Sequence, residues 1–223
     1  MNRIRFYQVG LWLILFIPII ACSQQAKKQK ETSTADFSKL PPNSSAAIDT
    51  ATFAAGCFWC VEAQFQVVDG VQSVTSGYIG GKVKNPTYKQ VSSGNTGHAE
   101  AINIVFDPKI ITFDELLEMF FLAHDPTQLN RQGNDVGTQY RSAIFVHSKA
   151  QLDKVNYYIK KLNEEKVYDK PLVTQVEPYG TFYKAEDYHQ EYYLNNGGEA
   201  YCQYVIQPKL EKFKKVFSNK LKN

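Results

Sequence analysis

The sequence of 223 residues predicts an α+β fold, because segments with the apolar patterns of strands and of helices alternate along residues 51–223. Their order is strand, helix, strand, strand, helix, strand. That order is typical of the ferredoxin-like split βαβ arrangement, a two-layer sandwich with helices on one face of an antiparallel-rich sheet. We expect this unit to carry an extra C-terminal strand, further helices and long loops.

The first half of the unit is predicted from apolar segments and the turns between them. Residues 51–55 are a short apolar run, which predicts a strand, and a helix follows over residues 58–68. The dipeptide Asp69-Gly70 marks the turn into a second strand over 71–78. After a long loop punctuated by glycines, residues 99–106 alternate as a third strand.

The second half begins with a helix that has a clear start signal. Thr112 is a predicted N-cap with Glu115 three residues later, and apolar side chains recur at helical spacing up to His124. This pattern predicts a helix with one buried face. Four more elements complete the prediction: a strand over 141–147, a helix near 149–164, a strand near 172–177 and a helix from about 208.

The first 21 residues resemble a lipoprotein-type signal peptide. Arg3 and Arg5 precede an apolar stretch over 11–20, which is too short for a membrane-spanning helix of ~20 apolar residues. Residues 19–22 resemble the lipobox of bacterial lipoproteins, which implies cleavage before Cys22 and a lipid on its sulfur. The alternative is an ordinary signal peptide followed by a fortuitous cysteine.

Residues 22–50 predict a lipid-anchored flexible tether, because they are largely polar and show no apolar period. We therefore expect an extracytoplasmic protein anchored to a bacterial membrane, on the periplasmic side where the cell has two membranes. In such a cell, Ser23 resembles the signal for sorting to the outer membrane. The folded domain is expected over residues 51–223.

The charges of that domain balance. Residues 1–50 hold six of the 25 Lys and Arg residues and three of the 22 Asp and Glu residues, which leaves 19 of each. A balanced domain without a basic stripe excludes a nucleic-acid partner, and we expect a monomer. The lysine-rich end, Lys209 to Lys222, predicts a solvated helix face, with contact to lipid headgroups as the alternative.

Residues 56–60, Gly-Cys-Phe-Trp-Cys, predict thiol redox chemistry. Because the motif lies between a predicted strand and a predicted helix, Cys57 falls at a helix N-terminus. Unpaired backbone N–H groups and the helix dipole favour a thiolate there. The thiolate is the nucleophilic form of cysteine, so we expect Cys57 to be the nucleophile.

Five further motifs accompany this pair of cysteines. In their order and spacing the chain resembles the A class of peptide methionine sulfoxide reductases over about residues 51–205. The matching segments are Asn85-Pro86-Thr87-Tyr88, Thr96-Gly97-His98-Ala99-Glu100, His124-Asp125-Pro126-Thr127, 131–142 and 185–190. The resemblance implies that residues 51–223 are a catalytic domain that reduces methionine S-sulfoxide without a cofactor; the substrate is protein-bound methionine sulfoxide, with the free amino acid as an open alternative.

The resemblance also implies the roles of individual residues. Cys57 attacks the sulfoxide sulfur, Glu100 donates a proton to the sulfoxide oxygen, and the hydroxyls of Tyr88 and Tyr140 bind that oxygen. Glu100 must stay protonated at neutral pH, which a partly buried, apolar position achieves by raising its pKa. The implied substrate-binding residues are Phe58 and Trp59, as a wall for the methyl group, with Asp135 and His189.

A second cysteine is expected to resolve the sulfenic acid that forms on Cys57, because a sulfenic acid condenses with a thiol to give a disulfide. Cys60 stands where the commoner family motif has glycine, and it is one helical turn from Cys57. Cys202 matches a resolving cysteine in the family's C-terminal tail. We favour Cys60 on proximity, since a mobile tail has to become ordered to bring Cys202 close.

An outside dithiol must then reduce the disulfide, and the resemblance implies thioredoxin or, for an exported protein, a thioredoxin-like protein outside the cytoplasm. Oxidised proteins containing methionine sulfoxide are the other expected partners. Three rival readings remain: a dithiol–disulfide exchanger that uses Cys57 and Cys60, a module that only binds oxidised methionine, and a structural zinc site. The single Cys-x-x-Cys pair makes the zinc site weak, so we expect no metal.

Overall fold

The computed structural model describes residues 35–42 and 47–222. The predicted signal peptide, the anchoring Cys22 and most of the predicted tether lie outside these residues. Within the described part of the chain, no helix is both long and apolar enough to cross a membrane.

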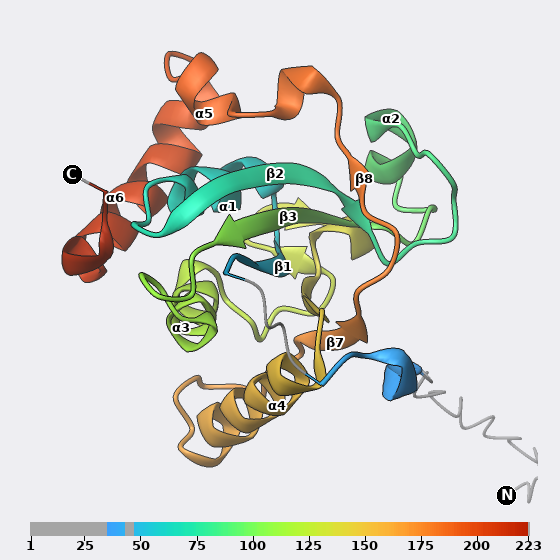
Figure 1. Cartoon of the computed structure of the whole chain (residues 1–223). Helices are drawn as coiled ribbons and strands as arrows, with labels where there is room; N and C mark the ends of the chain where they lie inside the picture. The colour runs from blue at the N-terminus through green and yellow to red at the C-terminus, as the bar shows by residue number, and fades with distance from the viewer. Residues whose placement is uncertain (1–34, 43–46, 223) are drawn as a thin grey trace, which may run out of the picture. The chain divides into compact units, whose positions relative to one another are not determined.

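A sheet of six strands forms the centre of the structure, in the order β7-β6-β1-β3-β2-β8 (Figure 1). Its four central strands run antiparallel to one another, while β7 joins β6 in parallel and β8 pairs antiparallel with β2. The order β6-β1-β3-β2 is that of the split βαβ unit, so the predicted fold class is confirmed. The strands are β1 (Asp49–Ala55), β2 (Val71–Ile79), β3 (Ala99–Phe106), β6 (Ser142–Val146), β7 (Gln175–Pro178) and β8 (Tyr183–Lys184).

Two helices, α1 (Phe58–Gln66) and α3 (Phe113–Ala123), connect the central strands and cover one face of the sheet. Thr112 caps α3 through the predicted capping box with Glu115. Phe53 of β1 packs against rings from both helices, with its ring centroid 4.9 Å from that of Phe120 and 5.8 Å from that of Phe65. Burying each such side chain contributes ~1.5–3 kcal/mol, so these rings hold the two layers together.

The opposite face of the sheet is lined by small side chains and is covered by the C-terminal part of the chain. Ala54, Ala101 and Ala143 are buried there beside the partly buried ring of Phe182. Any side chain at Gly77 would collide with that ring, since an added Cβ would lie about 2.4 Å from it. The small residues therefore leave room for the segment that carries Phe182 to pack against this face of the sheet. Beyond β8 the chain continues toward α1.

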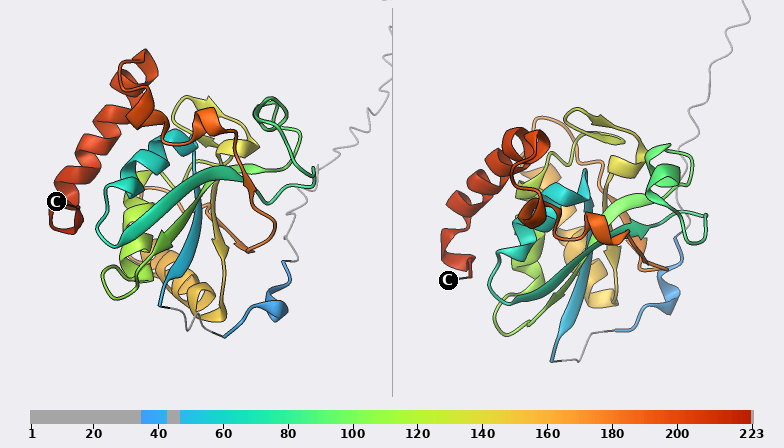
Figure 2. Two further views of the ribbon diagram at one scale, coloured as in Figure 1. Left: turned by 45° about the horizontal axis from the view of Figure 1, so that its top comes forward. Right: turned by 90° about the horizontal axis from the view of Figure 1, so that it is seen from above.

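The C-terminal region holds two more helices, which wrap around α1 (Figure 2). The short helix α5 (Tyr192–Asn195) is followed by a π-helical turn (Cys202–Ile206) that leads into α6 (Gln207–Val216). α6 was predicted to within a residue, whereas the π-helical turn left no pattern in the sequence. The predicted first helix ends early, because the Val67 carbonyl accepts from Lys222 and Val68 forms a bridge with Leu221.

Three of the small elements that escaped prediction lie in the long loops before β3 and β6. They are α2 (Tyr88–Ser92) and a hairpin of β4 (Arg131–Gln132) and β5 (Asp135–Val136). A further helix, α4 (Lys149–Glu164), has its predicted bounds and begins at the N-cap Ser148. The loops that carry α2 and the hairpin approach the β1–α1 junction, which makes them important for the site.

The ordered domain begins before residue 51, earlier than the sequence predicted. Phe37 and Leu40 pack against the core, and the carbonyls of Pro41 and Pro42 accept hydrogen bonds from the first N–H groups of α4. These groups satisfy donors that a helix leaves unpaired at its N-terminus. The part of residues 22–50 that the structure describes is therefore attached to the domain rather than a free tether.

Two partly buried histidines are in their neutral form. His124 bonds the Phe120 carbonyl at 2.8 Å and Ser142 Oγ at 2.8 Å, and His147 bonds Thr52 Oγ1 at 2.8 Å. Burial lowers the pKa of each imidazole to about 4. In the unfolded chain, both imidazoles have the usual histidine pKa of about 6.5.

This difference predicts a loss of stability in mild acid. Because the folded pKa lies below the unfolded value, the stabilisation is complete above pH ~6.5 and is lost as pH falls toward 4, by an amount on the order of 2–3 kcal/mol for each ring. Urea unfolding at several pH values measures it. Replacing both rings, by His124→Gln and His147→Gln, should flatten the profile between pH 6.5 and 4; an unchanged slope would contradict this assignment.

Candidate active site

Cys57 lies at the junction of β1 and α1, where the chain turns sharply from strand to helix. Gly56 has a φ of +90°, and a Cβ on it would lie 2.7 Å from the side chain of Gln132 in the β4–β5 hairpin. Only glycine combines this conformation with so close an approach. Cys57 is the N-cap of α1 and is 8% exposed, so the predicted place at a helix N-terminus is confirmed.

Three cysteines lie together in this part of the molecule. Cys57, Cys60 and Cys202 are all buried with free thiols and pack in one apolar cluster with Ile206 and Leu210. Cys202 belongs to the π-helical turn before α6, so the C-terminal segment is already ordered. The argument that favoured Cys60 over a mobile Cys202 therefore does not apply to this structure.

Of the two neighbouring cysteines, Cys60 ionises to the thiolate more readily. We had expected the thiolate on Cys57. The pKa of the Cys57 thiol is raised well above its usual value, because it donates to the Cys60 sulfur, is buried and faces Glu100. The pKa of Cys60 is lowered, because it accepts that hydrogen bond and has the Lys209 ammonium 3.8 Å from its sulfur. The hydrogen bond from Cys57 and, after it, the nearby cationic side chain therefore favour the thiolate on Cys60.

Glu100 is buried beneath the first turn of α1. It comes from β3, is 1% exposed, and accepts a hydrogen bond from the Phe58 N–H at 3.2 Å. Burial raises the pKa of this carboxyl to about 8, and the neighbouring Asp135 adds to the shift. Glu100 is therefore predominantly protonated at neutral pH, as the sequence analysis required for a proton donor.

Two tyrosine hydroxyls face the same carboxyl. Tyr88 is the first residue of α2, and Tyr140 ends a 3₁₀ turn after the hairpin. Burial raises the pKa of Tyr88 to about 12, the nearby Glu100 contributes to this shift, and the pKa of Tyr140 is raised for the same reasons. Both hydroxyls stay protonated at neutral pH and can donate hydrogen bonds to an oxygen atom.

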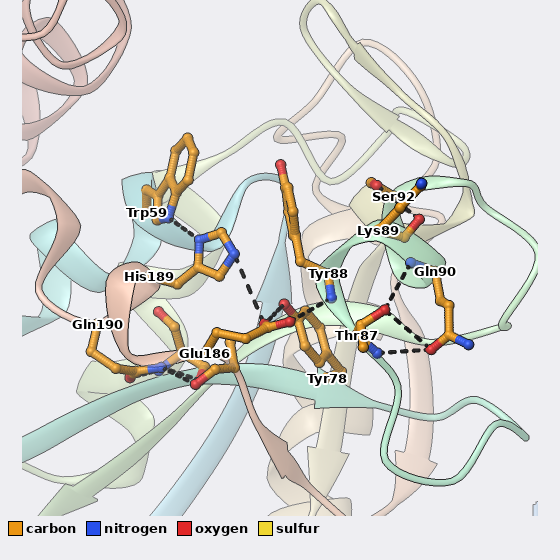
Figure 3. A network of polar contacts seen from close by, with 12 residues as sticks. Trp59, Tyr78, Thr87, Tyr88, Lys89, Gln90, Ser92, Glu186, His189 and Gln190 are labelled. Carbon is orange, nitrogen blue, oxygen red and sulfur yellow. Dashed lines mark hydrogen bonds and ion pairs between the residues drawn. The ribbon is translucent and has the colours of Figure 1, made fainter.

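Trp59 supplies an aromatic wall beside Cys57. Its ring stacks on Tyr192 with centroids 3.7 Å apart, and its indole N–H donates to Nδ1 of His189 at 3.1 Å (Figure 3). Phe58 and His189 are each only 1% exposed, so both lie behind the wall rather than on its surface. His189 thus orients Trp59 and is itself covered.

Glu186 joins the parts of this wall. Its carboxylate accepts hydrogen bonds from Tyr78 Oη and from the Tyr88 N–H, each at 2.8 Å, and lies 4.0 Å from Nε2 of His189 (Figure 3). Since Trp59 donates to Nδ1, the proton of neutral His189 is on Nε2 and points toward this carboxylate. The predicted segment 185–190 contains Glu186, but we had singled out only its histidine.

Tyr201 and Lys209 are further members that the sequence did not reveal. The Tyr201 hydroxyl donates to Oδ2 of Asp135 at 3.3 Å and also interacts with Cys57, while its ring contacts Trp59. Lys209 had been assigned to a solvated helix face, yet it points at Cys60. Both residues come from the C-terminal segment, whose path over α1 no local pattern encodes.

These side chains define a thiol-based oxidoreductase: a cysteine at a helix N-terminus, a protonated carboxyl, two phenols and a second thiol within reach. Among residues 35–42 and 47–222, no three metal-ligating side chains converge on a common point. The comparisons with known proteins give the family. A model described as peptide methionine sulfoxide reductase matches residues 49–221, and the chain belongs to that family.

Individual relatives support the same family assignment. Peptide methionine sulfoxide reductase MsrA of Deinococcus radiodurans is 54% identical over 79% of this chain and 86% of its own length, and that of Leptospira borgpetersenii is 53% identical over 76% and 95%. The solved structure of reduced Mxr1 from Saccharomyces cerevisiae superposes with a TM-score of 0.64 at 33% identity, over 74% of this chain and 93% of that one. Methionine sulfoxide reductase A of Corynebacterium diphtheriae gives 0.59 at 34% identity, over 71% and 82%. The chain is thus a thiol-dependent methionine sulfoxide reductase.

Proposed function

We propose that Cys57 carries out the reduction of methionine S-sulfoxide, with Glu100 as its acid. The observation that supports this assignment most strongly is the buried, protonated Glu100 carboxyl, which is held by the backbone of the residue next to Cys57. A sulfoxide oxygen bound by Glu100, Tyr88 and Tyr140 presents its sulfur to Cys57. The methyl group then faces Trp59, and Asp135 closes the other side together with Tyr201.

The first step transfers oxygen from the substrate to Cys57. Glu100 protonates the sulfoxide oxygen, and the Cys57 sulfur attacks the sulfoxide sulfur while its own proton passes to the Glu100 carboxylate that this leaves. The oxygen moves to Cys57, which leaves methionine and a Cys57 sulfenic acid. The substrate sulfur gains two electrons and Cys57 loses two, so no cofactor is required.

The second step forms a disulfide and releases water. A resolving thiolate attacks the Cys57 sulfur and displaces the hydroxyl, which leaves as water after it is protonated. Cys60 and Cys202 both lie in the cluster, so either is placed to act. A thioredoxin-like dithiol outside the cytoplasm then exchanges with the disulfide and restores both thiols, becoming a disulfide itself.

The experiment that tests this function compares the two epimers. The full chain, purified in detergent with dithiothreitol as reductant, should reduce the S epimer of a peptide methionine sulfoxide and leave the R epimer unchanged. Cys57→Ser should abolish turnover, because a hydroxyl at that position cannot form a sulfenic acid. Chromatographic detection of methionine measures both reactions.

The outcomes separate this reading from its rivals. Turnover that survives in Cys57→Ser would mean that another cysteine is the nucleophile. Folded, reduced protein that turns over neither epimer, but reduces a generic protein disulfide, would instead indicate a dithiol–disulfide exchanger.

The raised pKa of Glu100 predicts how activity depends on pH. The acid form is the active one, so the rate of sulfenic acid formation should fall as pH rises through about 8. Glu100→Gln cannot donate a proton and should slow this step by ~10²-fold or more at pH 7. Single-turnover release of methionine, measured from pH 6 to 9.5, gives both values.

A stability measurement on the same variant provides the control. The folded pKa of Glu100 is above its unfolded value, so its favourable contribution is complete below pH ~4.5 and is lost as pH rises through about 8. Glu100→Gln stays neutral and keeps an acceptor for the Phe58 N–H. The variant should lose most of its activity yet be more stable than the parent at pH 9; a less stable variant would show that the fold favours the ionised carboxyl and that its pKa is not raised.

We also propose, from the sequence of residues 1–22, that the protein is exported and anchored by a lipid on Cys22. This part of the proposal is supported by Arg3, Arg5, the apolar stretch and the Ala21-Cys22 junction. Labelled palmitate supplied to a bacterial host should be incorporated into the parent and into Cys202→Ser, but not into Cys22→Ser. Unlabelled parent protein in the soluble fraction would exclude the anchor.

A further inference from the structure

The side chain of Lys209 distinguishes the two candidate resolving cysteines. It projects from α6, and its Nζ lies 3.8 Å from Sγ of Cys60. Lys209 is only partly exposed, whereas the next lysine along the helix, Lys212, is exposed. An ammonium group at this distance from a buried sulfur stabilises the thiolate over the thiol.

The other groups around Cys60 do not supply a second positive charge. Cys57 and Tyr201 offer neutral hydrogen-bond donors, and Asp135 and Glu100 are acidic groups whose ionised forms oppose a thiolate. Cys202 adds a third thiol to the cluster. Among these neighbours in the described chain, Lys209 is therefore the group whose charge favours a Cys60 thiolate.

Cys202 has the opposite surroundings. It is fully buried, and its pKa is raised by that burial and by the nearby Glu199 and Cys60. Attack on a sulfenic acid needs a thiolate. The two candidates thus differ in their charge environments, and Cys60 is also the one that shares a hydrogen bond with Cys57.

We propose that Lys209 is a positioning residue for the resolving step: its ammonium group keeps Cys60 as the thiolate that attacks the Cys57 sulfenic acid. The S–S bond forms between Cys60 and Cys57, and the hydroxyl of the sulfenic acid leaves as water. Together the two cysteines have then lost the two electrons that the sulfoxide gained when it became methionine. This inference rests on the proposed function, which it deepens by assigning Cys60 as the resolving cysteine.

The first experiment measures the thiolate without requiring activity. In the full chain with Cys22, Cys57 and Cys202 replaced by Ser, Cys60 is the only remaining thiol, and its ionisation is followed by absorbance at about 240 nm. Lys209→Met should raise the Cys60 pKa by about one unit or more. Lys209→Arg keeps the charge and should recover most of the shift, and Lys212→Met, on the same helix, should leave the pKa unchanged.

The second experiment measures the step itself, in Cys202→Ser protein so that only Cys60 can resolve. After one equivalent of methionine S-sulfoxide, methionine should appear at the same rate with and without Lys209→Met. The sulfenic acid, trapped with dimedone, should persist about three- to fourfold longer at pH 7 in Lys209→Met. A pKa higher by one unit makes the Cys60 thiolate fraction about tenfold smaller. The more basic thiolate is also about threefold more nucleophilic, which leaves a net slowing of about three- to fourfold.

The pH profile distinguishes charge from structure. Disulfide formation in Lys209→Met should approach or exceed the parent rate at pH 9.5, where Cys60 is ionised in both proteins. A Cys60 pKa unaffected by Lys209→Met, or equal slowing by Lys209→Arg and Lys209→Met, would overturn the proposal. A parent protein that forms no methionine would contradict the proposed function instead, while the titration would still report on Lys209.

Discussion

The site depends on one buried contact, the hydrogen bond from the Phe58 N–H to the Glu100 carboxyl. It ties the first turn of α1 to β3 and so fixes the acid relative to Cys57, which immediately precedes Phe58. The contact is possible because β1 and β3 are adjacent and antiparallel, and because Gly56 allows a turn that brings the helix N-terminus over the sheet. The same burial keeps the carboxyl protonated. The Phe58 N–H contact by itself favours the carboxylate, and burial outweighs it.

The C-terminal segment completes the site from the other side. Gln190 pairs with both the N–H and the carbonyl of Ser76, and the buried Glu62 carboxylate accepts the Tyr192 N–H at 3.2 Å. These contacts hold Tyr192 on Trp59 and Cys202 beside the other cysteines. In this arrangement all three sulfurs are buried, whereas exchange with a dithiol partner needs an accessible disulfide. Reduction therefore requires the segment to move, and the few polar contacts that fasten it are the ones that must break.

Charges within the site are divided between its two ends. At the end where we propose that the sulfoxide oxygen binds, the groups are neutral donors: a protonated carboxyl and two phenols. Near Cys60 the Lys209 ammonium favours an anion. The first end suits protonation of a leaving oxygen, and the second suits nucleophilic attack by sulfur. The partly buried, neutral His124 and His147 are part of the scaffold and do not belong to either end of the site.

The sequence alone determined the central strands and helices, the cysteine pair and the acid, because each leaves a local signal: apolar period, capping residues or a motif of fixed spacing. It also placed Cys57 at the start of α1. Tertiary structure decided what depends on contacts between distant segments. The docking of residues 35–42, the roles of Glu186 and Tyr201 and the burial of Cys202 all arise where the C-terminal or N-terminal segment meets the sheet or α1. Lys209 shows the reason most clearly: in the sequence it is one lysine of a polar helix face, and only the packing of α6 on α1 puts its charge beside a sulfur.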